Sequence, residues 1–125
     1  AATKAATLLP TSTILGTDVR TPNNDGFGTI ESLVIDSERN QVIYALVAHG
    51  GLLGMGESLY PIPLQRLTWI DGEDSYMVDI TEERLGKIKS VPREEIPATI
   101  RGASLREFYS SFDLDPNGKP LPKGS

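Results

Sequence analysis

The sequence contains no cysteine, one histidine and one tryptophan among its 125 residues. Without cysteine, the chain cannot form a disulfide framework, a thiol nucleophile or a cysteine-ligated metal site. Its longest apolar stretch is far too short to cross a bilayer, so no membrane span is expected. No signal peptide is visible, but the chain starts without methionine, which leaves a removed presequence open. We expect a soluble cytoplasmic protein, although a chain without thiols suits either redox environment.

Basic residues are fewer than acidic residues. Twelve Lys and Arg face 17 Asp and Glu, which gives a formal charge of -5 and a pI near 4.8. Binding to a phosphate backbone depends on clustered Lys and Arg, and no such cluster is present, so no direct nucleic-acid binding is expected. The 38% hydrophobic and 23% charged residues are ordinary for one globular domain, so neither disorder nor a metal requirement for folding is indicated.

Short apolar runs separated by turn-forming residues predict five or six strands, at 14–21, 26–36, 42–49, 58–64, 68–70 and 75–80. A register break in the second run predicts a bulge near Glu31 and Ser32. Asn40 is a candidate for positive φ in the following hairpin loop. Pro61 and Pro63 alternate, so both missing N–H groups can face away from one neighbouring strand, which predicts a sheet edge or a barrel seam.

The run 42–63 organises this pattern. Its first part, 42–49, is almost continuously apolar and predicts the longest strand, buried on both sides. Four glycines follow, and we interpret them as a structural loop between two core strands: Gly50, Gly51, Gly54 and Gly56. A phosphate-binding loop is disfavoured because Glu57 stands where its fingerprint requires lysine.

Two helices are expected beyond the strands. Thr81 can cap a short helix whose Leu85 and Ile88 dock on the sheet. A second helix over 105–112 has an apolar stripe made of Leu105, Phe108, Tyr109 and Phe112. The stripe either folds back onto its own barrel or forms an exposed face that docks on another subunit or protein.

Side chains suited to catalysis or metal binding are present but form no recognisable cluster. His49 ends a strand, and a local hydrogen bond is favoured for it over catalysis. The carboxylates of Asp18, Asp36, Glu57 and Asp79 are expected in turns and ion pairs. Residues 113–118 copy the opening of a calcium loop, but Gly124 replaces its bidentate glutamate, so a turn is favoured. No catalytic residue, cofactor or metal site is predicted.

Three stretches together resemble the PRC-barrel family: GTDVRTPNNDGFGTIESLVID, VIYALVAHGGLLGMGESLYPIPLQRLT and YMVDITEERL. This family includes the cytoplasmic barrel of the photosynthetic reaction-centre H subunit and the C-terminal domain of the ribosome-maturation factor RimM. The resemblance covers about 14–89 and implies a mainly β fold. The expected form is a small, strongly bent antiparallel β-barrel with a short capping helix and a C-terminal helical extension.

The expected organisation is a flexible arm over 1–13, a free-standing PRC-barrel over 14–89 and an extension over 90–125. Because the resemblance implies a docking module and no catalytic cluster is visible, we predict a non-catalytic adaptor or stabilising subunit, acting as a homo-oligomer such as a dimer. One alternative is a small-molecule or ion-binding sensor or enzyme at the rim near His49 and Glu57. A weaker one is a ribosome-associated factor.

Overall fold

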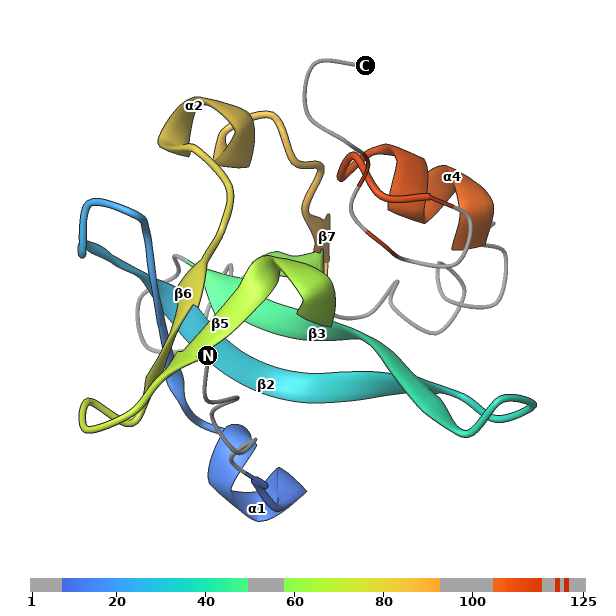
Figure 1. Ribbon diagram of the computed structural model, residues 1–125. Helices are drawn as coiled ribbons and strands as arrows, with labels where there is room; N and C mark the ends of the chain where they lie inside the picture. Colours follow the sequence, from blue (N-terminus) through green and yellow to red (C-terminus); the bar gives the residue numbers. More distant parts are fainter. Residues whose placement is uncertain (1–7, 50–57, 93–104, 116–118, 120, 122–125) are drawn as a thin grey trace, which may run out of the picture.

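A computed structural model describes residues 8–49, 58–92, 105–115, 119 and 121 (Figure 1). Within these residues, β-strands dominate and the helices are short. In chain order the elements are α1 (Thr11–Ile14), β1 (Asp18–Arg20), β2 (Gly26–Asp36), β3 (Gln41–His49), β4 (Ser58–Pro63), η1 (Leu64–Arg66), β5 (Leu67–Ile70), β6 (Ser75–Val78), α2 (Glu82–Leu85), β7 (Val91–Pro92) and α4 (Leu105–Ser110).

The seven strands form one sheet in the order β5-β6-β1-β2-β3-β4-β7, which confirms the mainly β fold class. Hydrogen bonds do not close this sheet into a ring among the described strands, since β5 and β7 stand at its two ends. The prediction of purely antiparallel pairing is wrong at one place, because β1 and β6 are parallel. Parallel neighbours need a long connection, and here the chain runs through β2 to β5 between them.

Strand β2 bends because its register shifts twice against β3. One shift lies between Ile30 and Ser32, which confirms the predicted bulge, and the other lies between Val34 and Ile35. With 11 residues, β2 is the longest described strand, so the prediction that 42–49 forms the longest is wrong; β3 has nine. The hairpin between them contains Asn40 at a φ of 55°, as predicted.

Strand β3 is buried on both faces, as its apolar sequence predicts. Ala45 and Val47 belong to an inner cluster that comprises Val19, Ile30, Ala45, Val47, Ile62, Leu67, Tyr76, Val78 and Leu85. Tyr44 and Leu46 point to the opposite side of the strand. They belong to an outer cluster that comprises Ile43, Tyr44, Leu46, Leu59, Tyr109, Phe112 and Leu114. The sheet therefore has two cores, and the chain beyond residue 104 supplies part of the second.

Strand β4 lies between β3 and β7, so the predicted edge position does not hold for the whole strand and holds only for the part that contains the two prolines. Pro61 lies opposite Leu46 and Pro63 opposite Tyr44, so both prolines occupy equivalent positions along β3. On its other side, β4 pairs with β7 only through Ser58 and Leu59. Over residues 60–63, β3 is thus the one partner strand within the described chain.

The two ends of the family-like region differ in how well the sequence predicts them. At the start, a strand from residue 14 is wrong, because α1 includes Ile14 and Gly16 adopts a φ of 86° before β1 begins. Leu9 packs on the inner cluster, whereas Leu8 is exposed. At the other end, the Thr81 hydroxyl accepts the Arg84 amide hydrogen bond at 3.3 Å, which confirms the predicted cap of α2.

At Gly28, strand β2 approaches β3 closely, and this position supplies a first test. A Cβ at this position would lie 2.2 Å from the Ala48 carbonyl oxygen, and backbone atoms cannot easily move away. We expect Gly28→Ala to lower the free energy of unfolding by about 1–3 kcal/mol in urea titrations, the usual cost of overpacking. The matched control is Gly26→Ala in the same strand, where a Cβ would meet nothing within 4 Å. Equal stabilities of the two variants would contradict the close approach.

Candidate interaction site

The apolar stripe predicted on the second helix lies against the chain's own sheet. Tyr109 and Phe112 are 5% and 7% exposed within the outer cluster, and Phe108 packs against its edge. The rings of Phe108 and Tyr44 have centroids 4.7 Å apart, and those of Phe108 and Phe112 are 5.1 Å apart. Helix α4 begins at Leu105, whose side chain lies outside the described part of the structure. This is the fold-back arrangement that the sequence left open beside the docking one.

The end of α4 forms a Schellman-type turn. Asp113 has a φ of 58°, its amide donates to the Ser110 carbonyl at 3.1 Å, and the Leu114 amide donates to the Tyr109 carbonyl at 3.0 Å. This pattern usually places glycine at the left-handed position, but Asp113 occupies it here. The turn directs Leu114, which is 2% exposed, back into the outer cluster beside Tyr109. We call residues 105–115 the C-terminal segment.

Arg66 binds this turn from the barrel side. Its Nε and Nη2 donate to the Phe112 carbonyl at 3.1 and 2.8 Å, and Nη2 also donates to the Asp113 carbonyl at 3.3 Å. The Arg66 side chain is only 17% exposed, and its Nη1 lies 3.5 Å from a carboxylate oxygen of Asp79. Carbonyls at a helix end lack partners within the helix, so a planar guanidinium with several donors suits them well.

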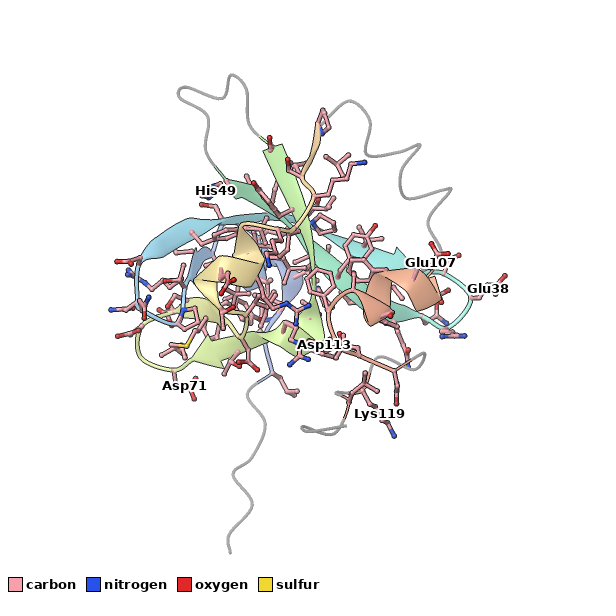
Figure 2. The ribbon with its side chains drawn as sticks, turned by 90° about the horizontal axis from the view of Figure 1, so that it is seen from above. Glu38, His49, Asp71, Glu107, Asp113 and Lys119 are labelled. Atoms are coloured by element: carbon pink, nitrogen blue, oxygen red, sulfur yellow. The ribbon has the colours of Figure 1, made fainter. Side chains whose placement is uncertain are left out.

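Arg84 binds the same turn from α2. Its Nη2 donates to the Ser111 carbonyl at 3.1 Å, and its Nη1 forms an ion pair with the Asp113 carboxylate. Asp113 lies between α2 and α4 (Figure 2), so the ion pair joins the two helical regions. We call Arg66 and Arg84 the arginine pair. Together they provide a positively charged end to the mainly apolar contact of the outer cluster.

His49 lies at the far end of β3, away from α4 (Figure 2). Its ring stacks on Phe27 with centroids 4.6 Å apart and meets the edge of Tyr60 at 5.5 Å. Its Nδ1 forms a hydrogen bond with the Phe27 carbonyl oxygen. His49 thus makes the local hydrogen bond that the sequence favoured. Its expected neighbours lie outside the described residues: Glu57 and the loop glycines Gly50, Gly51, Gly54 and Gly56.

Of the predicted carboxylates, Asp18 lies exposed in β1 and not in a turn, whereas Asp36 and Asp79 take part in separate local contacts. Asp36 accepts the amide hydrogens of Glu38 and Arg39, and Asp79 pairs with Arg66. In the calcium-like tail, Asp115 accepts the Lys119 amide hydrogen bond, which is the contact of a turn. Within the described ranges, no three His, Asp or Glu side chains form a group that could hold a metal ion.

These features define a small, mainly β protein with one strand buried on both faces and a helical segment bound to its outer side. The sequence model of the PRC-barrel domain family matches residues 7–85, and the chain belongs to this family. No curated protein matches it. The family match ends with α2, so the C-terminal segment lies beyond it while both residues of the arginine pair lie within it.

No helix in the described ranges has the length and apolarity that a membrane crossing requires. Neither the arginine pair nor Leu114 is among the residues predicted from the sequence. The available signal was the acidic residue that follows the amphipathic helix, since a carboxylate and free carbonyls at one helix end attract cations. That signal does not indicate which of the chain's arginines binds the helix end.

The first prediction from this site concerns Arg66. We expect Arg66→Ala to lower the free energy of unfolding by about 2 kcal/mol, because it removes charge-assisted hydrogen bonds from partly buried carbonyls. Arg66→Lys should restore little, since an ammonium cannot reproduce the guanidinium fork. Hydrogen exchange should accelerate at the amides of Phe112 and Leu114 more than in β3. Arg39→Ala, at a 59% exposed side chain, is the control and should change neither quantity. Unchanged exchange in Arg66→Ala would contradict the assignment.

The second prediction concerns the pKa of Tyr44. Burial raises this pKa, and that of Tyr76, above the ordinary value of 10.0. A folded-state pKa above the unfolded one means that stability is complete below about pH 10 and is lost as the pH rises through the folded pKa. We expect the free energy of unfolding to fall above pH 10, and less steeply in Tyr44→Phe. Absorbance titration of phenolate checks the shift directly. An identical pH slope in the variant would count against it.

Proposed function

We propose that the chain is a non-catalytic PRC-barrel interaction module that serves as an adaptor or stabilising subunit of a larger assembly. Its family membership supports this proposal, since the resemblance implies a barrel used for docking in unrelated assemblies. The proposed working form is a homo-oligomer, with a dimer as the simplest case, located in the cytoplasm. Its partners are proteins, because the acidic chain has no cluster of Lys and Arg for a phosphate backbone.

The observation that supports this function most directly is the aromatic cluster on the outer side of β3, whose edge at Phe108 is half-buried. Tyr44, Phe108, Tyr109 and Phe112 lie side by side there, and Phe108 remains half-buried at the edge of the outer cluster. Aromatic residues are enriched at protein interfaces because they bury a large area with little loss of side-chain freedom. We infer that the stripe of Leu105, Phe108, Tyr109 and Phe112 contributes to partner binding.

The proposed organisation of the chain has three parts. Residues 14–89 form the barrel domain, 1–13 an arm and 90–125 an extension specific to this chain. The family match over 7–85 approximately supports the range proposed for the barrel domain. The glycines Gly50, Gly51, Gly54 and Gly56 keep their proposed role as a structural loop in the barrel, rather than as a ligand site.

The test is capture of partners by the full chain in cells of its native source, combined with sedimentation of the purified protein. We expect a defined protein partner and a species larger than the 13.5 kDa monomer. Phe108→Ser should reduce capture, because it removes the half-buried ring. Ile35→Ser is the matched control, since Ile35 is a 59% exposed apolar residue on β2. Circular dichroism verifies that both variants fold. A monomer that captures no macromolecule would overturn the proposal.

A further inference from the structure

The outer side of β3 and β4 has the properties of a receptor for a helical segment. Tyr44, Leu46 and Leu59 form its apolar surface, and all three lie within the family match. Tyr109, Phe112 and Leu114 cover that surface, and all three lie beyond the match. The buried residues that cover this apolar face of the family core therefore lie beyond the match, and the partly buried Ile80 and Ile88 also pack against the cluster.

Charge complementarity fixes one end of the segment on this face. The arginine pair belongs to the family core, whereas its acceptors belong to the C-terminal segment: the carbonyls of Ser111, Phe112 and Asp113 and the Asp113 carboxylate. Aromatic side chains thus meet an apolar surface, and an acidic helix end meets two cations. Every one of these contacts joins side chains or carbonyls across the two parts, so a segment from another molecule could make the same set.

The chain length allows such an exchange. Twelve residues, 93–104, connect β7 to α4. Fully extended, twelve residues span at most about 40 Å. A 125-residue domain has a radius of gyration of about 14 Å, so this connection is long enough to reach a neighbouring molecule. Exchange in both directions gives two identical contacts, as a two-fold symmetric dimer requires.

We propose that the outer face of β3 and β4, with the arginine pair, is a docking site for the C-terminal segment of a second copy of this chain. In the described structure, the chain's own C-terminal segment occupies this site. This inference rests on the proposed function and specifies its interaction surface and its partner. The chain's own segment competes at an effective concentration in the millimolar range, so exchange is favoured at high protein concentration or when the internal contact is weakened.

Complementation between two full-length variants tests the site. The face variant is Arg66→Glu with Arg84→Glu, and the segment variant is Tyr109→Ser with Phe112→Ser. Each variant weakens its own internal contact from one side, and the intact face of the second can bind the intact segment of the first. We expect each variant alone to sediment as a monomer and their equimolar mixture to contain 1:1 heterodimers. A chain with all four substitutions, mixed with the segment variant, is the matched control and should give none. A mixture of folded variants that stays monomeric would overturn the proposal.

A second measurement keeps Arg66 and the aromatic contacts of the segment intact, in case these variants fail to fold. Because the chain has no cysteine, single cysteines can be placed at the exposed contact between Arg84 and Asp113. Chains with Arg84→Cys are mixed with chains with Asp113→Cys and treated with a short bis-maleimide. We expect at least tenfold more linked dimer than with Glu73→Cys in place of Arg84→Cys, since Glu73 lies in the exposed turn between β5 and β6. Equal yields would overturn the exchange.

These outcomes separate the two proposals. Absence of heterodimers, together with continued capture of another protein by the full chain, rejects the second copy as occupant and leaves the adaptor function intact. Absence of both rejects the adaptor function as well. Heterodimers that form in the mixture of the face and segment variants, but not in the control mixture with the four-substitution chain, support the docking site. This holds whatever other partner the full chain captures.

Discussion

The burial of β3 on both faces is the constraint on which the rest of the structure depends. Five consecutive residues, 43–47, are buried, and neighbouring side chains of a strand point in opposite directions. One sheet face alone can therefore bury only half of them. On one face, the bent sheet brings the other residues of the inner cluster over Ala45 and Val47. On the other face, the C-terminal segment covers Tyr44 and Leu46. Loss of the segment would expose the second set to water.

The bend that serves the inner face depends on local features of β2. Two register shifts curve the strand, and the absence of a side chain at Gly28 lets it approach Ala48 closely. This curvature agrees with a sheet in which β6, distant in sequence, joins β1 in parallel. The inner cluster then receives residues from both neighbours, including Val19 and Val78. The same curvature does not bury the outer face. Residues of the C-terminal segment bury it instead.

Local chemistry made part of this fold predictable. The bulge near Glu31, the positive φ of Asn40, the single partner strand beside Pro61 and Pro63, and the Thr81 cap each depend on a few adjacent residues. Features that depend on distant contacts were not predictable. The parallel pair of β1 and β6 is one example.

The arginine pair is a second example of a distant contact, because Arg66 is 46 residues from Phe112 and Arg84 is 29 residues from Asp113. The amphipathic pattern of 105–112 indicated an apolar stripe. It contained no information on which surface the stripe covers, since its own sheet and a partner offer the same chemistry. Asp113 resembles the first ligand of a calcium loop, which the sequence disfavoured, and it serves as the left-handed residue of a helix end.

The contacts of the segment differ in how much sequence information they require. Arg66 binds main-chain carbonyls, which every helix end provides, so this contact selects a geometry and not a side chain. Selectivity must come from the aromatic positions that fit against Tyr44, Leu46 and Leu59, and from the one carboxylate that Arg84 binds. The proposed docking site therefore requires two things of its occupant: apolar residues at this spacing and an acidic residue just beyond the helix end. The chain's own C-terminal segment satisfies both conditions, and its covalent attachment makes it the strongest competitor for the site.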